Sequence, residues 1–510
     1  MKDTDRTDQP FALSLHDADN ILVALRAVPA GTELPGGVIT REAIPAGHKI
    51  AQLSVRAGEN ILKYGQIIGA ATADIAAGAH VHVHNLGMGA HKQNYDFGAA
   101  AQALPAADSA AEFQGYHRPS GRVGTRNYLG ILTSVNCAGS VARFIAEAAA
   151  REDLLAAFPN VDGIVPIVHG SGCGMSGTGE GYETLFRTLA GYGHSANFGA
   201  ILMVGLGCEV MQIPDLIDRK ALRDSARFRY MTIQHEGGTR ATVDKGLALL
   251  RELAAEANKA TRAPASAGAL VLGMQCGGSD GYSGITANPA LGVASDLLVR
   301  HGGTSILSET SEIYGAEHLL TRRAVDDPTG RKLIDLIDWW EDYTARNFGE
   351  MDNNPSPGNK RGGLTTILEK SLGAVAKGGS APLAGVFKFA EPIDRKGFVF
   401  MDSPGYDPCS VTGQTASGAN LIAFTTGRGS VSGYQPVPSI KLASNPDLWR
   451  RMETDMDVNC GDILSGVSLE KKGREIFDLL LRVASGEQTK SEAQGFGSVE
   501  FVPWQIGAVM

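Results

Sequence analysis

Three histidines stand two residues apart near the start of the chain, in the segment Gly78-Ala-His-Val-His-Val-His-Asn85. Alternate side chains of an extended strand point to one face, so His80, His82 and His84 would project together. Imidazole is the commonest metal-binding side chain, and three-histidine sets are a known pattern of zinc and iron sites. The spacing therefore indicates a divalent metal site, with a solvated strand of polar residues as the alternative.

Glycine-rich polar loops follow four predicted strands, at residues 169–174, 205–209, 275–281 and 425–430. In open α/β sheets, ligands bind outside the carboxyl ends of the strands. Glycine there lets backbone N–H groups approach an anion closely. Four such loops favour a site for an anionic, oxygen-rich substrate over tight turns without a ligand. None has the dinucleotide-binding or Walker pattern, which argues against nicotinamide and nucleotide cofactors.

Two further segments are suited to hold a carboxylate. In Asn354-Pro-Ser-Pro-Gly-Asn-Lys360, two prolines and a glycine restrict the backbone and can fix the polar side chains at its end. Gly124-Thr-Arg-Asn127 offers a guanidinium that can bind a carboxylate through two hydrogen bonds. A surface turn and a surface ion pair are the respective alternatives.

Four of the six cysteines, Cys137, Cys173, Cys208 and Cys276, each lie just past a predicted strand end. Four thiols at one sheet edge would be able to hold an iron–sulfur cluster. However, no pair has the close spacing typical of such ligands, and free cysteines are often buried. Buried or supporting positions are therefore the alternative interpretation for these cysteines.

Length and composition bound the class of protein. The 510 residues are enough for roughly two to four domains, and the net charge of −9 gives no support to nucleic-acid binding. No apolar run is long enough for a transmembrane helix, and the polar residues 1–10 do not resemble a secretion signal. We therefore expect a cytoplasmic protein with reduced cysteines and neither nucleic acid nor membrane as a partner.

The chain divides into an all-β part followed by two α/β parts. Residues 11–95 combine short strands with closely spaced turn signals, and residues 96–117 have the composition of a linker. Beyond them, apolar runs of strand length alternate with amphipathic helices, which is typical of layered α/β domains with mainly parallel sheets. A polar break at residues 258–268 separates a second domain, 118–265, from a C-terminal domain, 266–510.

Several long segments, taken in order, resemble the altronate/galactarate dehydratase family across nearly the whole chain. These segments are Gly47-His-Lys49, Lys63-Tyr-Gly65, His80-Val-His-Val-His-Asn85, Gly205-Leu-Gly-Cys-Glu209, Cys276-Gly-Gly-Ser-Asp-Gly-Tyr-Ser-Gly-Ile-Thr-Ala-Asn-Pro289, Asn354-Pro-Ser-Pro-Gly-Asn-Lys360 and Thr426-Gly-Arg-Gly429. The first domain looks like the small β-clip (SAF) domain of that family. The histidine segment looks more like the altronate and sulfolactate branches than the galactarate branch.

The resemblance implies a hydro-lyase that converts a sugar acid, an altronate-like aldonate or an aldarate, into a 2-keto-3-deoxy acid. It also implies dependence on a divalent metal, with Fe2+ or Mn2+ expected and Zn2+ or Mg2+ as alternatives. The partner is then a small-molecule sugar acid, and a homo-oligomer is the default assembly. A sulfolactate-type sulfo-lyase, an iron–sulfur hydro-lyase and a non-catalytic sugar-acid binding protein remain as alternative functions.

The implied reaction suggests roles for particular residues. Removing the proton at C2 places a second negative charge on the substrate carboxylate, so the site needs a metal, cationic groups and a general base. We expect His169, which follows a predicted strand and matches a histidine of the family, to be the base, and His48 or Lys63 to be the acid. The expected metal ligands are His80, His82 and His84. The expected substrate-binding residues are Arg126, Asn127, Asp280, Asn288, Asn359, Lys360 and Arg428.

Overall fold

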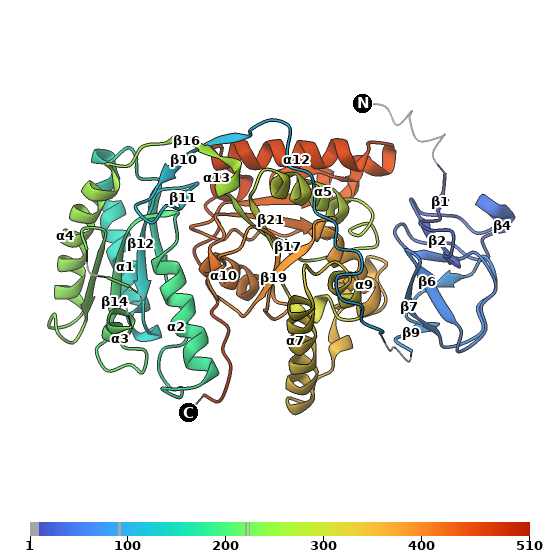
Figure 1. Cartoon of the computed structure of the whole chain (residues 1–510), viewed down its shortest axis with the longest axis horizontal. Coiled ribbons are helices and arrows are strands. Elements are labelled where there is room, and N and C mark those ends of the chain that lie inside the picture. Colours follow the sequence, from blue (N-terminus) through green and yellow to red (C-terminus); the bar gives the residue numbers. More distant parts are fainter. Residues whose placement is uncertain (1–9, 90–92, 220–221, 224, 510) are drawn as a thin grey trace.

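The computed structural model describes residues 10–89, 93–219, 222–223 and 225–509, which form three domains in a row (Figure 1). The N-terminal and second domains lie at opposite ends, with the C-terminal domain between them. The expected α/β class with a small strand-rich first domain is confirmed. Among the described residues, no helix combines the length and apolar composition that a bilayer crossing requires. The polar residues 1–9 lie outside the described ranges.

The N-terminal domain consists of short, mostly antiparallel strands. These are β1 (Ala12–Leu13), β2 (Ile21–Ala24), β3 (Glu33–Leu34), β4 (Val38–Ile39), β5 (Lys49–Ala51), β6 (Asn60–Lys63), β7 (Gln66–Ala71), β8 (His80–Val81) and β9 (Leu86–Gly87). β2 is buried on both faces because alternate side chains enter different cores. Leu22 packs with Ile50, whereas Ile21 and Val23 belong to a core shared with the C-terminal domain. The domain is therefore joined to its neighbour by apolar packing.

The second domain is a four-stranded parallel sheet with helices on both faces. Its strands are β12 (Tyr128–Thr133), β13 (Gly163–Ile167), β14 (Phe198–Gly205) and β15 (Phe228–Thr232), and its helices are α1 (Gly139–Arg151), α2 (Glu180–Gly193), α3 (Ile213–Asp218) and α4 (Thr239–Ala257). The strand order is β13-β12-β14-β15. Leu129 and Ile131 pack with α1 and α4, whereas Leu132 packs with α2 and α3. This two-sided cover explains why β12 is apolar along its length.

The C-terminal domain contains a seven-stranded parallel sheet in the order β19-β20-β18-β17-β21-β22-β23. Its strands are β17 (Val271–Cys276), β18 (Thr304–Leu307), β19 (Leu383–Phe387), β20 (Gly397–Met401), β21 (Leu421–Thr426), β22 (Ser439–Ala443) and β23 (Val458–Asn459). Its helices are α5 (Ala287–Arg300), α6 (Glu317–Thr321), α7 (Asp327–Arg346), α8 (Pro357–Arg361), α9 (Ile367–Val375), α10 (Asp407–Ser417), α11 (Pro446–Arg451), α12 (Leu469–Ala484) and α13 (Lys490–Ala493). The chain builds outward from β17 on one side and returns to β21 on the other, so the carboxyl ends of β17 and β21 flank the position where ligands bind in such sheets.

Two segments expected to be irregular pair as strands instead. β10 (Glu112–His117) falls in the expected linker, and β16 (Ala263–Ser266) falls in the expected polar break. They pair antiparallel, with β11 (Val123–Gly124) on the other side of β10. Each segment is too short and too polar to signal a strand by itself. It is stable as a strand because it pairs with a partner far away in the sequence.

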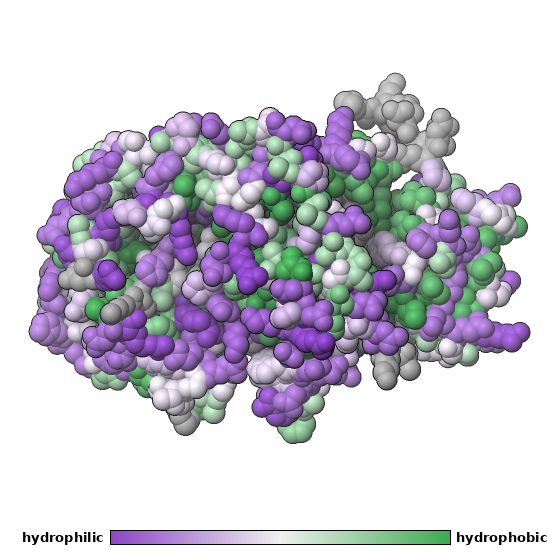
Figure 2. All heavy atoms as spheres, viewed as in Figure 1, coloured by the Kyte–Doolittle hydropathy of each residue, from purple (hydrophilic) through white to green (hydrophobic). Residues whose placement is uncertain are grey.

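On the face shown in Figure 2, polar side chains predominate, with smaller apolar areas among them.

Candidate functional site

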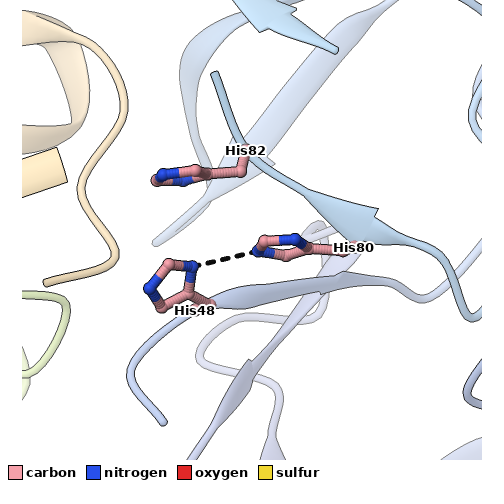
Figure 3. Close-up of side chains that lie close together, drawn as sticks. All are labelled: His48, His80 and His82. Carbon is pink, nitrogen blue, oxygen red and sulfur yellow. Dashed lines mark hydrogen bonds between the residues drawn. The ribbon is translucent and has the colours of Figure 1, made fainter. Parts of the chain in front are cut away.

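Three histidine side chains converge in the N-terminal domain where it meets the C-terminal domain. One nitrogen from each of His48, His80 and His82 lies within 4.8 Å of the other two. Nδ1 of His48 is 3.0 Å from Nε2 of His80, and the ring centre of His82 is 4.7 Å from that of His48 (Figure 3). This spacing allows three imidazoles to face one ion, and we call these residues the histidine group.

Strand pairing explains why His48 joins the group. β8 pairs antiparallel with β5, and this register places His80 opposite Ile50. His48 directly precedes β5, so its ring reaches the ring of His80 across the strand pair. The pairing joins residues more than thirty positions apart in the chain, which is why the spacing of the histidines alone did not identify His48 as a ligand.

The chain turns just after His80, and His84 stays outside the group. The expected extended segment is wrong beyond Val81, where β8 ends. The Asn85 side chain accepts a hydrogen bond from the backbone N–H of His82 and donates one to the carbonyl of His80, which closes the turn. His84 is exposed, and its ring centre lies 5.4 Å from that of His80. The structure therefore replaces His84 by His48 in the set of candidate ligands.

The electrostatic surroundings keep the histidine group neutral. Burial, followed by the charges of neighbouring basic groups, lowers the pKa of His80 to about 4 and that of His82 to about 3. Burial also lowers the pKa of His48. Neutral imidazole is the form that binds metal ions. Nδ1 of His82 is buried and has no hydrogen-bond partner among the described residues, so this donor set fits a divalent cation.

One buried carboxylate beside the histidine group holds two buried ammonium groups. Glu369 lies 2.8 Å from Nζ of Lys49 and 2.9 Å from Nζ of Lys63. Burial opposes the charge of Lys63, but Glu369 outweighs it and raises the pKa of Lys63 above its usual value. Lys63 therefore keeps its proton and is unsuited to the expected acid role. Burial lowers the pKa of Lys49 to about 8. Neither Lys49, which directly follows His48 in a family-like segment, nor Glu369 was among the expected site residues.

The histidine group faces the carboxyl edge of the large sheet. Nε2 of His48 lies 3.3 Å from the carbonyl oxygen of Arg361. A Cβ added at Gly281, in the loop after β17, would lie 2.0 Å from the carbonyl oxygen of Gly47, and one at Gly363 would lie 2.3 Å from it. Only glycine permits this approach of the two backbones. The glycine-rich loop after β17 therefore serves as a docking surface for the N-terminal domain.

Several expected substrate-binding side chains of the C-terminal domain hold the loops together. Asp280 accepts hydrogen bonds at both carboxylate oxygens, from residues after β17 and β22. Asn288 and Asn359 likewise use both their amide oxygen and nitrogen on neighbouring segments. Lys360 is half-buried and Arg428 is exposed near this edge. Of the residues expected here, the two basic side chains remain suited to contact an anionic substrate.

The expected base and two expected binding residues belong to the second domain, which lies at the opposite end of the molecule from the N-terminal domain that carries the histidine group (Figure 1). His169 is buried, with Nε2 3.0 Å from the carbonyl oxygen of Thr133 and Nδ1 accepting from the N–H of Ser171. Burial lowers the pKa of His169 to about 4. Asn127 donates to two backbone carbonyls of its own domain. We expected His169, Asn127 and Arg126 to share a site with the histidines. Within a single chain they do not.

Arg126 ties the second domain to the C-terminal domain. Its five N–H groups donate to the carboxylate of Glu492 and to the carbonyls of Thr125, Val483 and Glu487.

Arg126→Lys is expected to lower the free energy of unfolding by about 2–3 kcal/mol, because lysine cannot form the paired bonds to Glu492. Urea unfolding measures this effect, whereas kcat/KM of the folded protein should stay unchanged. A raised KM with an unaltered urea midpoint would restore the expected role in carboxylate binding.

A second charged group is buried at the carboxyl ends of β17 and β18. Sγ of Cys276 and carboxylate oxygens of Glu309 and Glu312 lie within 4.8 Å of one another. Lys377 donates to Cys276 at 2.8 Å, and Lys370 donates to Glu312. These two ammonium groups oppose a divalent cation at this place. The expectation of four cysteines at one sheet edge is wrong, because Cys276 belongs to this buried charged group of the C-terminal domain, whereas the other three cysteines lie in the second domain. Glu309 closely follows β18. Its position just after a strand is the sequence signal that could have identified it as a candidate site residue.

Comparison with known proteins covers nearly the whole chain. Residues 10–89 match the altronate/galactarate dehydratase SAF domain, residues 115–258 the D-galactarate dehydratase/altronate hydrolase second domain, and residues 267–509 the D-galactarate/altronate dehydratase C-terminal domain. The altronate dehydratase of Escherichia coli (strain K12) is 34% identical over 488 residues, which cover 95% of this chain and 97% of that protein. The galactarate dehydratase (L-threo-forming) of the same strain is 37% identical over 496 residues, 94% of either chain. The (2R)-sulfolactate sulfo-lyase subunit beta of Chromohalobacter salexigens is 32% identical over 387 residues, 75% of this chain and 95% of that protein.

Proposed function

Because the chain belongs to the altronate/galactarate dehydratase family of sugar-acid hydro-lyases, we propose that it dehydrates an altronate-like aldonate or aldarate to a 2-keto-3-deoxy acid with the help of a divalent cation. We assign His48, His80 and His82 as the residues that hold the cation. The observation that carries this proposal is the convergence of three neutral imidazoles, one with an unpartnered buried nitrogen, at the edge of the large sheet.

When bound to the three histidines, the cation would act as a Lewis acid on the carboxylate and a hydroxyl of the substrate. Imidazole ligands suit iron and zinc, and oxygen-rich substrates suit manganese and magnesium. We therefore propose Fe2+ or Mn2+ as the working ion, with Zn2+ and Mg2+ as the alternatives that a metal panel distinguishes.

The residues around the histidine group bind and orient the anionic substrate. Glu369 cancels one of the charges of Lys49 and Lys63, so the buried trio of side chains carries a net positive charge when both lysines are protonated. This charge favours the doubly negative carboxylate that forms when the C2 proton leaves. Lys360 and Arg428 present further positive charge from the C-terminal domain. The N-terminal domain, docked on the glycine-rich loop, limits access of water to this space.

A substrate panel tests the proposed reaction. The purified protein is expected to form a 2-keto-3-deoxy acid from altronate or a related aldonate or aldarate, and addition of Fe2+ or Mn2+ after chelation should restore activity. The product is followed with a colorimetric assay for 2-keto-3-deoxy acids. Release of sulfite from sulfolactate, without turnover of any sugar acid, would favour the sulfo-lyase reaction of the 32% identical relative instead. Thermal stabilisation by sugar acids without turnover would point to a binding protein.

A further inference from the structure

Three exposed cysteines remain unexplained in the second domain. Cys137 lies between β12 and α1, Cys173 follows β13, and Cys208 follows β14. These strands are neighbours in the order β13-β12-β14 and run parallel. Their carboxyl ends therefore meet at one edge of the sheet, and each contributes one thiol to it.

Hydrogen bonds between residues next to the cysteines interlock the three loops. The N–H of Asn136 donates to the carbonyl of Ser171 at 2.9 Å, and the N–H of Val210 donates to the carbonyl of Gly172 at 3.0 Å. Gly172 has a φ of +97°, and a Cβ there would lie 2.2 Å from the carbonyl oxygen of Ser134. The loops are thus packed backbone against backbone, which holds the three cysteine-bearing segments in a fixed relation.

The position of this edge in the topology favours a ligand. The chain passes from β12 to β13 on one side and then to β14 on the other, so the carboxyl ends of β12 and β14 flank a switch point of the sheet. Cys137 lies in the short 3-10 helix Asn136–Ala138 that leads into α1, and the N-terminal end of a helix favours negative charge. Cys173 also lines a cavity of about 50 Å³ together with residues 503–509. The edge is therefore partly sheltered by the end of the chain.

We propose that Cys137, Cys173 and Cys208 bind an iron–sulfur cluster through three thiolates. The three sulfur atoms do not all lie within 4.8 Å of one another, unlike the ligand atoms of the histidine group, so a single tetrahedral ion fits them poorly. A multinuclear cluster spans a wider set of thiols. Such clusters ordinarily take four cysteine ligands, so three leave one iron open to an oxygen donor such as water or the hydroxyl of a hydroxy acid.

This centre is separate from the histidine group and does not rest on the proposed function. It lies in the second domain, whereas the histidine group lies in the N-terminal domain at the other end of the molecule (Figure 1). The two centres can therefore be gained and lost independently.

Glu209 strengthens the edge of the second-domain sheet, because its carboxylate accepts hydrogen bonds from the Ser134 hydroxyl and from the N–H of Gly207.

The test is the iron and acid-labile sulfide content of protein purified without oxygen and reconstituted with Fe2+ and sulfide. The wild type is expected to hold both, with broad visible absorption, and Cys137→Ser, Cys173→Ser and Cys208→Ser should each lose most of the sulfide. Cys409→Ser and Cys460→Ser, which remove buried thiols elsewhere, serve as matched controls and should retain it. Wild-type protein without labile sulfide, or full sulfide in any of the three variants, would overturn the proposal.

A second measurement covers variants that fail to fold. Reconstitution of the wild type should protect all three cysteines from iodoacetamide, as mapped by mass spectrometry of peptides, whereas the apoprotein should be alkylated at all three. Equal alkylation in both forms would overturn the assignment. His82→Ala should keep its labile sulfide, so failure of the histidine assignment and failure of the cluster assignment give different results.

Discussion

Glu369→Gln is expected to lower the free energy of unfolding by about 3–5 kcal/mol, the cost of breaking a buried ion pair from one side. Glutamine keeps the shape of the side chain but removes the charge that compensates Lys49 and Lys63. The carboxylate also accepts hydrogen bonds from the N–H and hydroxyl of Thr365, so its loss loosens the start of α9. Urea unfolding followed by circular dichroism measures the change.

Glu183→Gln is the matched control for this substitution. Glu183 pairs with Arg219 on the surface, where their side chains are 41% and 45% exposed. Solvent screens such a pair, so this variant should lose no more than about 1 kcal/mol. An equal, small effect of both substitutions would contradict the account of the buried trio.

The contribution of Glu369 to the free energy of unfolding is expected to depend on pH. Burial would raise the pKa of Glu369, but the charges of Lys49 and Lys63 outweigh burial and hold it below the usual range. Its stabilising contribution is therefore complete above about pH 4.3, the ordinary glutamate value, and is lost as the pH falls through the lower folded value. The difference in urea midpoint between the wild type and Glu369→Gln should shrink on acidification below about pH 4.

His80→Ala and His82→Ala are each expected to lower kcat/KM by about 100-fold or more, because each removes an assigned ligand of the cation that stabilises the developing charge. Steady-state assays with saturating Fe2+ or Mn2+ measure this loss, and circular dichroism verifies that the fold persists. His84→Ala is the matched control, since its ring belongs to the same segment but lies outside the histidine group. Wild-type activity in both ligand variants would remove the assignment.

The sequence predicted the layout of the molecule well, because strand-length apolar runs and amphipathic helices depend on local residue pattern. The all-β first domain and the two parallel α/β domains follow from that pattern. β10 and β16 escaped prediction because their pairing partners are about 150 positions apart. Their strand character is a property of the folded chain and not of either segment alone.

The candidate site was predicted in part. The spacing of His80 and His82 correctly indicated that their side chains lie close together, since their rings stack at 5.4 Å. His84 was misplaced because the Asn85 turn ends the strand, and His48 entered through the register of β5 with β8. Such a register depends on tertiary packing and cannot be read from residue spacing.

Charged residues were the least predictable part. Arg126 looked like a free carboxylate clamp, but Glu492, more than 350 positions later, takes up its guanidinium. Lys63 and Glu369 likewise find each other across about 300 positions. Whether a charged side chain is available to a substrate or used for structure depends on such distant partners.

The most decisive measurement is the number of Mn2+ ions bound per chain after chelation and equilibrium dialysis, since Mn2+ is distinct from the iron of any iron–sulfur cluster. We predict that the wild type and His84→Ala bind one Mn2+ tightly, and that His48→Ala and His82→Ala lose it while remaining folded. Full Mn2+ occupancy in His48→Ala and His82→Ala, or its loss in His84→Ala alone, would contradict the histidine group as the metal site.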